Sequence, residues 1–250
     1  MAAVLARPFT LLNTILLALF ISGTSLAQAQ HRIVQTNGSE RVGIIQEVSN
    51  GNISIKVDAG TIGIPMRTVA SVQMPAPPQI EQAQQAYLSG NPSQALQIIS
   101  PITDKFAGLP TEWARGAVQL QAEAALAAED IASAKQGFEA LSQLYGDEAG
   151  AKIGLIRVDI EEGRLDEAEK ALEPMVTIAL EDPKPDSIKG IRYGQVMLAN
   201  GILKEKQEQY PEALENYLRV VAVFDSDPAT QAIAEGKAES LREAHDVVVP

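Results

Sequence analysis

The side chains that most often perform catalysis are few in this sequence and lie far apart. It contains two histidines, His31 and His245, and no cysteine. A general acid or base must lie in a pocket within hydrogen-bonding reach of its target, and both histidines fall outside the central segments that would line a pocket. The lack of cysteine excludes disulfides, thiolate metal sites and cysteine nucleophiles. The sequence therefore predicts a protein that is not an enzyme and holds no cofactor.

The acidic residues offer no clear metal site either. A short acidic run at residues 225–227 begins like a calcium-binding loop, but Pro228 and the absence of the later glycine and glutamate break that pattern. The acid pairs fall at expected helix ends and turns, where capping explains them. These pairs are Glu129-Asp130, Asp147-Glu148, Glu161-Glu162 and Glu181-Asp182. We expect no metal site.

The composition is that of a soluble globular protein with an acidic surface. Hydrophobic residues make up 46% of the chain, charged residues 21% and aromatic residues 4%. A core built mainly from Ala, Leu, Ile and Val suits closely packed helices better than an aromatic-lined pocket. The formal net charge is -12, and no run of Lys and Arg is present to neutralise phosphates, so nucleic acid is not an expected partner.

Residues 1–29 have the three parts of a secretory signal peptide. Arg7 lies in the short first part, an apolar run spans residues 9–21, and Ala27-Gln28-Ala29 forms a small-x-small cleavage site. The apolar run is shorter than the roughly 20 residues that a membrane-spanning helix needs. We therefore expect cleavage near Ala29, a periplasmic or secreted protein, and no stable membrane anchor afterwards. The alternative is that the segment is retained as an anchor.

Residues 30–74 have the alternating pattern of a small β module. Ile53, Ile55 and Val57 fall on one face of a predicted strand, and glycine-containing turns separate it from its neighbours. Five strands fit, at about 32–36, 41–48, 52–58, 61–66 and 71–74, with a one-turn helix from 67 to 71. The layout resembles SH3-like or Sm-like barrels. The module contains no Phe, Tyr or Trp, so the aromatic groove that binds proline-rich peptides is not expected, and a structural or docking role is favoured.

A proline-rich linker at residues 75–79 separates this module from a helical domain at 80–246. Pro75, Pro77 and Pro78 favour an extended connector. Beyond it we expect four helical hairpins and a last polar helix that caps them. Pro101 should kink or shorten its helix. The predicted helices are 80–90, 93–106, 111–128, 131–145, 149–162, 165–179, 187–207, 210–224 and 228–245.

The four hairpins share a pattern of small residues. Gly163 is suited to the left-handed conformation that ends one helix, and Ala168 leaves room for two helices to cross closely. Equivalent alanines occur at Ala95, Ala134 and Ala213, and a bulky residue follows four positions later at Ile99, Phe138, Leu172 and Tyr217. A small residue also recurs in the middle of the first helices, at Ala83, Ala122 and Gly201. Over residues 80–225 the chain resembles tetratricopeptide repeats, whose period of 34 residues separates Ala134 from Ala168.

The chain departs from the tetratricopeptide pattern in places. The other two spacings between the alanines are 39 and 45 residues, Ile156 stands where a small residue belongs, and most of the closing prolines are missing. The predicted fold is thus α+β and mainly α, with a small β-barrel-like module followed by an array of tetratricopeptide-like α-hairpins that form an irregular superhelix.

The resemblance implies that the first helix of each hairpin lines a concave surface. Mixed polar side chains on those helices would then face an extended peptide, with Tyr87 as the strongest single candidate. The implied partner-binding residues are Gln84, Tyr87, Gln119, Glu123, Arg157, Glu161, Glu205 and Lys206. For each one the alternative is a solvated helix face. Trp113, the only tryptophan, follows the predicted N-cap Thr111, and is expected to pack between the first two hairpins or to anchor a partner.

These features predict an exported, non-enzymatic scaffold that binds a peptide or protein partner in the cell envelope. The combination of signal peptide, β module and divergent repeats also resembles uncharacterised envelope proteins of Gram-negative bacteria. The alternative is an accessory subunit of an envelope enzyme or polymer-handling complex, docked through the β module. The sequence leaves the partner's identity and the oligomeric state open.

Overall fold

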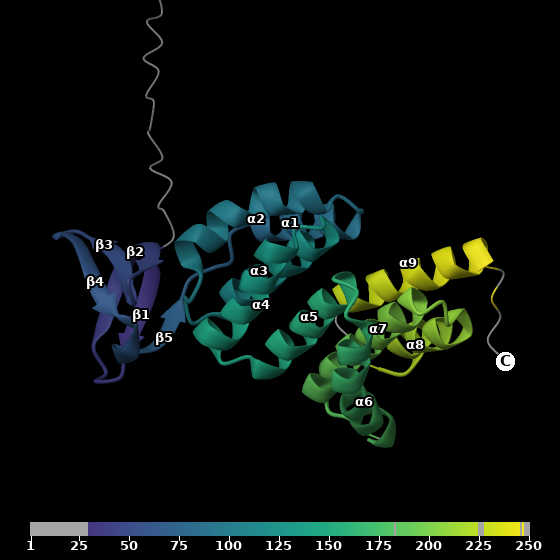
Figure 1. The fold of residues 1–250 in the computed structure, drawn as a ribbon. Helices are drawn as coiled ribbons and strands as arrows, with labels where there is room; N and C mark the ends of the chain where they lie inside the picture. Colours follow the sequence, from purple (N-terminus) through teal and green to yellow (C-terminus); the bar gives the residue numbers. More distant parts are fainter. Residues whose placement is uncertain (1–29, 183, 225–227, 246, 248–250) are drawn as a thin grey trace, which may run out of the picture.

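The computed structural model describes residues 30–182, 184–224, 228–245 and 247. In these residues a five-stranded sheet precedes an array of helices that extends away from it (Figure 1), so the predicted mainly helical α+β fold is confirmed. The predicted signal peptide at 1–29 lies outside the described residues.

The β module is an antiparallel sheet in which strands that follow each other along the chain are mostly neighbours. Its order is β4-β3-β2-β1-β5, and a 3-10 helix, η1, leads into the last strand as expected. The sequence resembled an SH3-like layout, and that resemblance stays a prediction. The elements are β1 (His31–Gln35), β2 (Glu40–Ser49), β3 (Asn52–Val57), β4 (Gly60–Pro65), η1 (Met66–Thr68) and β5 (Val69–Gln73).

Alternation along the strands produces the buried face of the sheet. Ile53 and Ile55 are fully buried, and their strand neighbour Lys56 is exposed. Ile55 lies opposite Ile45 on β2, which is also buried. The turn at Asn50-Gly51 has positive φ at both residues, as in a type I′ hairpin. A β-bulge between Ile45 and Glu47 then shifts the register, so that Ile45 lies opposite Ile55.

The helices begin and end within two residues of their predicted positions. The predicted N-cap Thr111 accepts a hydrogen bond from the backbone N–H of Ala114 at 3.3 Å. Pro101 does not shorten its helix, which continues to Phe106. The helices are α1 (Gln79–Leu88), α2 (Pro92–Phe106), α3 (Glu112–Ala127), α4 (Ile131–Tyr145), α5 (Glu148–Glu161), α6 (Leu165–Glu181), α7 (Ser187–Lys206), α8 (Tyr210–Ala222) and α9 (Pro228–His245).

The four hairpin turns share one backbone geometry. In each, a residue with left-handed φ ends the first helix, and the next N–H bonds back to the carbonyl five positions earlier, as in a Schellman motif. Two of the left-handed residues are glycines, Gly90 and Gly163. The other two are Glu129 and Glu208, with φ of 61° and 60°. A glutamate in this conformation is strained, so hydrogen bonds and packing must hold these two turns.

Small residues let the paired helices approach closely, as predicted. Ala95, Ala134, Ala168 and Ala213 all have 0% exposed surface. A Cβ atom added to Gly201 of α7 would clash with the ring of Tyr217 on α8, and one added to Gly154 of α5 would clash with Phe138 on α4. In these two contacts the aromatic side chain of a second helix thus fits against a glycine of a neighbouring first helix.

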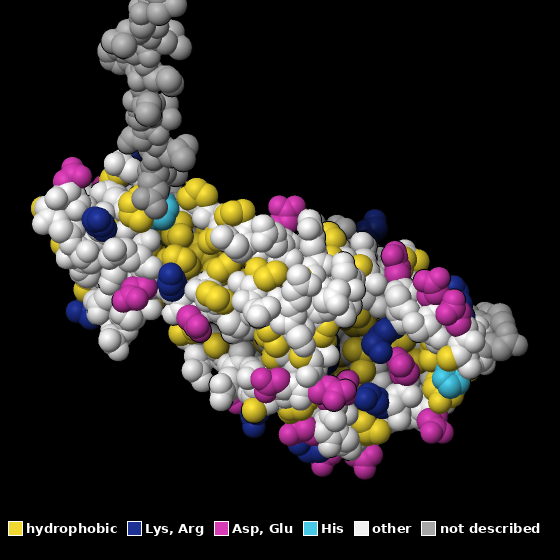
Figure 2. All heavy atoms as spheres, turned by 90° about the horizontal axis from the view of Figure 1, so that it is seen from above, with side chains coloured by type: hydrophobic (Ala, Val, Ile, Leu, Met, Phe, Trp, Pro, Cys, Tyr) yellow, Lys and Arg dark blue, Asp and Glu magenta, His cyan; other side chains and the backbone are white. Residues whose placement is uncertain are grey.

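The β module and the first helices share one hydrophobic core. Ile33, Ile53 and Ile64 of the sheet pack in the same cluster as Leu109, which precedes α3, and Ala114 in its first turn. On the surface, hydrophobic side chains gather where the sheet meets the helices (Figure 2). The division at residues 75–79 stays a prediction, but the two parts are joined by buried contacts and not only by the prolines.

Trp113 lies at this junction. Its Nε1 donates a hydrogen bond of 2.9 Å to the carbonyl oxygen of Met74, and its ring meets Phe106 edge to face with centroids 5.8 Å apart. The expectation that it packs among the first helices is therefore met. The hydrogen bond to Met74 also joins the end of the sheet to α3. The sequence pattern did not indicate this contact.

Helix α9 does more than cap the last hairpin. Ala234, Ala238 and Leu241 are buried against the neighbouring helices, and α9 contacts α7, α8 and also α1. The first and last described helices of the array therefore meet, which encloses a hollow between them.

Candidate functional site: a groove inside the helical array

The hollow is a groove of about 770 Å³ bounded mainly by the first helices of the hairpins. It is lined by α1, α3, α5, α7 and α9, together with part of α4. A volume of this size is in the range of ligand-binding pockets in proteins. The predicted concave surface therefore exists, but α9 closes one side of it.

Helical spacing places one stripe of side chains from each helix in the groove. On α3 the stripe is Glu112, Gly116, Gln119, Leu120 and Glu123, residues that recur every three or four positions. Stripes of the same kind run along α1 (Ile80, Gln84, Tyr87), α5 (Gly150, Ile153, Gly154, Arg157), α7 (Ile188, Ile191, Arg192, Gln195, Leu198) and α9 (Ala229, Thr230, Ile233).

The groove lining mixes polar and apolar side chains on each wall. Gln84 and Gln119 of α1 and α3 lie among Ile80 and Leu120, and Ile188 and Ile191 of α7 lie among Arg192 and Gln195. Ile188 is 77% exposed, the largest value among the exposed large hydrophobic residues described.

Three of the predicted residues form one cluster in the groove. Arg157 of α5 makes an ion pair with Glu123 of α3 and a hydrogen bond with Tyr87 of α1. The side chains of Arg157 and Glu123 are only 12% and 18% exposed. Burial alone would lower the pKa of Arg157, but the Glu123 carboxylate and Tyr87 raise it, so the guanidinium stays charged. This cluster ties three successive hairpins together.

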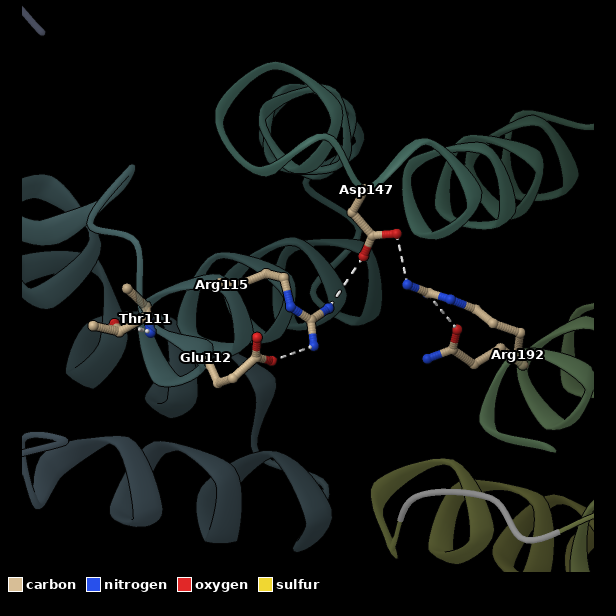
Figure 3. Close-up of polar contacts among 7 residues, drawn as sticks. Thr111, Glu112, Arg115, Asp147 and Arg192 are labelled. Atoms are coloured by element: carbon tan, nitrogen blue, oxygen red, sulfur yellow. Dashed lines mark hydrogen bonds and ion pairs between the residues drawn. The ribbon is translucent and has the colours of Figure 1, made fainter. Parts of the chain in front are cut away.

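A second cluster is centred on Asp147, the N-cap of α5. One carboxylate oxygen accepts a hydrogen bond of 2.6 Å from Arg192 of α7 and one of 3.0 Å from the backbone N–H of Gly150. The other oxygen accepts one of 3.1 Å from Arg115 of α3, which also pairs with Glu112. Figure 3 shows the two guanidinium groups approaching Asp147 from α3 and from α7.

The environment of Asp147 keeps it ionised. Burial alone would raise the pKa of its carboxyl, but the hydrogen bonds from Arg192 and from the Gly150 N–H, with the charges of both arginines, lower the pKa below its usual value. The carboxylate side chain is 9% exposed. Asp147 therefore both caps α5 and bridges the arginines of α3 and α7.

The charges that line the groove cancel. Three cations, Arg115, Arg157 and Arg192, are each paired with an acid that also lines it, namely Glu123 or Asp147. With Glu112 the lining holds three positive and three negative groups. In a chain of net charge -12 this neutral interior differs from the rest of the surface.

The structure divides the predicted partner-binding residues into two groups. Gln84, Tyr87, Gln119, Glu123 and Arg157 line the groove, so the helical faces were assigned correctly for these positions. Their role in binding stays a prediction.

The remaining predicted residues lie beyond the groove lining. Glu161 pairs with Lys206 at 2.8 Å between α5 and α7. Glu205 accepts hydrogen bonds from Tyr217 and Lys237. Their contacts join neighbouring helices.

Several lining residues were not predicted. Gly116 lies three residues before Gln119 on the same helical face, so this spacing could have indicated it. Arg115, Asp147 and Arg192 had no such signal, because their meeting depends on how three helices are stacked.

The described residues contain no group of three or more His, Cys, Asp or Glu side chains arranged to hold a metal ion. Within the same residues, no helix has the length and apolar character that crossing a membrane requires.

Comparison with known proteins agrees with the helical geometry. A family model described as tetratricopeptide repeat matches residues 125–189, from the end of α3 to the start of α7. The helical array is therefore tetratricopeptide-like, as the sequence pattern predicted. No curated protein matches the chain.

Two solved structures show a partial likeness. MamA from Desulfovibrio magneticus RS-1, from residue 41 to its end, has 17% sequence identity and a TM-score of 0.34, with 69% of this chain and 100% of that chain covered. The MamA RS-1 ArsTM double mutant also has 17% sequence identity, with a TM-score of 0.33. The match covers 69% of this chain and 99% of that chain. Such TM-scores reflect only a partial superposition of the two folds.

Proposed function

We propose that this protein is an exported, non-enzymatic scaffold that holds a segment of a partner protein in the groove of its helical array. The groove carries the proposal, because stripes of polar and apolar side chains from five helices line one hollow. Tetratricopeptide-like arrays are built to present such a concave surface.

Export rests on the sequence of residues 1–29, with its apolar run and its Ala27-Gln28-Ala29 site. The location we propose is the periplasm or the exterior of the cell. N-terminal sequencing of the protein recovered from outside the cytoplasm tests this, with a start near Gln30 expected. An intact Met1 on that protein would show that the segment is retained.

The binding experiment uses two exposed isoleucines as a matched pair. Ile188 lines the groove and is 77% exposed, whereas Ile178 on α6 is 58% exposed and lies outside the lining. Changing either to Asp should leave the fold intact, because both side chains are largely in solvent. Tyr87 and Arg157 are poorer probes, since they hold each other and Glu123 in place.

Affinity purification of the tagged full-length protein from its host should recover a partner that is lost from I188D and kept by I178D. Quantitative mass spectrometry measures this difference. Equal recovery by the two variants would show that the partner does not use the groove.

Exposed apolar residues on the sheet favour the second candidate, an accessory subunit docked through the β module. Val42 and Ile62 are 42% and 37% exposed. In that case V42D and I62D should abolish assembly while I188D has no effect. Deleting the module is not a clean test, because the sheet shares its core with α3.

A further inference from the structure

Strand β4 is an open edge of the sheet. Among the described residues it pairs only with β3, and Figure 1 shows it on the side of the sheet away from the helices. An edge strand presents unpaired N–H and C=O groups, and proteins usually protect such an edge with charged side chains, a bulge or a covering element. The sequence of β4, Gly-Thr-Ile-Gly-Ile-Pro, contains no charged residue, and its pairing with β3 is regular. The edge is therefore suited to pairing with another strand.

The register of the hairpin shows which groups of β4 face the open side. The N–H of Met66 donates a hydrogen bond of 2.9 Å to the carbonyl oxygen of Gly51, so these two residues continue the β3–β4 ladder as a hydrogen-bonded pair. Bonded and non-bonded pairs alternate along an antiparallel ladder. Thr61 and Gly63 therefore turn their N–H and C=O groups away from β3. Pro65 faces the same way, but it has no N–H to donate.

The side chain of Ile62 ends a row of isoleucines across the buried face of the sheet. Ile45 of β2 lies opposite Ile55 of β3, which lies opposite Ile62 of β4. Directly opposite residues point to the same face of a sheet. The exposed fractions along this row are 3%, 0% and 37%, so Ile62 is exposed where the row reaches the edge. A further strand beside β4 would cover it.

A second copy of β4 fits this edge. In an antiparallel pair centred on Ile62, Thr61 of each copy lies opposite Gly63 of the other, and these positions exchange about four main-chain hydrogen bonds. Every outward N–H and C=O group of Thr61 and Gly63 is then paired, and Pro65 is not needed as a donor. Ile62 comes beside Ile62 of the second copy, where each covers the other.

The charges around β4 also favour a second copy. The chain has a net charge of -12, which opposes self-association in general, but β4 contributes no charge. Asp58 lies in the turn before β4 and Arg67 just after it, and both are exposed. Antiparallel pairing brings the end with Asp58 of one copy next to the end with Arg67 of the other. The two-fold axis repeats this complementary contact.

We infer that two copies of this chain associate by antiparallel pairing of β4 with β4 about a two-fold axis at Ile62. Their two sheets then form one continuous sheet, and the same edge serves on both sides of the interface. The inference is independent of the proposed function, since β4 lies outside the groove lining. The dimer carries two grooves, so a partner with two binding segments gains avidity.

Sedimentation velocity of the tagged protein, purified from its host, tests the association. We expect a dimer whose proportion rises with concentration, because an interface of one strand per copy is small. I62K sets like charges directly opposite each other and should weaken the association by about ten-fold or more. V42K is the matched control, because Val42 is 42% exposed but lies on β2, which has a strand on each side. It should dimerise as the wild type does.

Cysteine cross-linking tests the register and does not depend on how I62K folds. The chain contains no cysteine, so a single introduced thiol can form a protein disulfide only between copies. In the inferred pair the two Cα atoms at position 62 are about 4.5 Å apart, which suits a disulfide. Those at position 63 are roughly 8 Å apart, which is too far. Under mild oxidation I62C should therefore cross-link about ten-fold faster than G63C.

Several results would overturn the inference. They are a wild type that stays monomeric at every concentration, a dimer that I62K retains or V42K loses, and equal cross-linking of I62C and G63C. Open-ended oligomers would indicate head-to-tail pairing of β4 with β5 of the next copy, and would also overturn it. If I62K fails to fold, the comparison of I62C with G63C decides. The proposed function is judged separately by I188D, which leaves β4 unchanged.

Discussion

Arg192 and Asp147 are 45 residues apart in the chain and are joined by a hydrogen bond of 2.6 Å. Asp147 also caps α5, so one carboxylate fixes the start of a helix and the position of α7. Because it receives Arg115 as well, the stacking of three hairpins depends on this residue.

Substitutions of Asp147 should separate capping from ion pairing. Asn is a good N-cap but has no charge, so D147N should lower the free energy of unfolding by about 1–2 kcal/mol. D147A removes the cap as well and should cost about 1 kcal/mol more. Urea unfolding at pH 7 measures both. An unchanged free energy of unfolding for D147N would show that pairing with the arginines contributes nothing, and equal losses for the two variants would show the same for the cap.

The contribution of Asp147 should also depend on pH. Its pKa is lowered in the folded protein, so its stabilisation is present above the unfolded pKa of about 3.9 and is lost as the pH falls through the folded value. The difference in stability between the wild type and D147N should therefore shrink in strongly acidic solution. A constant difference from pH 7 downward would contradict this.

Glycine at a strained hairpin turn should stabilise the protein. Replacing Glu208, at φ of 60°, by Gly should raise the free energy of unfolding by about 0.5–1 kcal/mol, because glycine adopts this conformation without strain. The reverse change at the equivalent turn, G163E, should lower it by a similar amount. Chemical denaturation measures both, and a destabilised E208G would show that the glutamate side chain stabilises the turn in another way.

Two helix glycines should respond in opposite ways to alanine. G201A places a methyl group against the ring of Tyr217 and should destabilise the protein by about 1–3 kcal/mol. G116A meets no neighbour and should stabilise it by about 0.5–1 kcal/mol through helix propensity. Thermal and urea unfolding measure the two values. If both variants were destabilised, the space beside Gly116 would not be open.

His31 should make the sheet sensitive to mild acid. Its Nδ1 accepts a hydrogen bond of 3.0 Å from the backbone N–H of Ile45, which requires an unprotonated nitrogen. Burial lowers the pKa of His31, so its stabilisation is present above the unfolded pKa of about 6.5 and is lost as the pH falls through the folded value.

The loss on protonation should be of the order of one hydrogen bond, about 0.5–1.5 kcal/mol. Asparagine can accept the same hydrogen bond without titrating, so H31N should remove this part of the pH dependence. Urea unfolding of the two proteins between pH 5 and 8 tests the idea. Parallel pH profiles for the wild type and H31N would exclude it.

Much of the fold could be predicted because its signals are local. Turn residues such as Gly163 mark where helices end, and N-caps such as Thr111 mark where they begin. The alternation of Ile53 and Ile55 with polar neighbours marks a strand. The small residue at Gly201 and the large one at Tyr217 even indicate which helices cross closely. The resemblance to tetratricopeptide repeats was enough to place Gln84, Tyr87, Gln119, Glu123 and Arg157 on the groove side.

What the sequence did not indicate depends on how distant elements meet. The hydrogen bond from Trp113 to Met74 joins the sheet to the helices, and nothing in either segment alone implies it. The tetratricopeptide resemblance placed Glu161 and Lys206 in the groove, whereas they pair with each other outside its lining. The role of Asp147 likewise depends on the relative placement of α3, α5 and α7.

The contact between α1 and α9 limits how this architecture can vary. Solenoids whose end repeats stay apart tolerate the gain or loss of a unit, since each unit touches only its neighbours. Here an inserted hairpin would push the two ends apart and leave the hollow without one of its walls. The number of hairpins in this protein is thus tied to the shape of the space that they surround.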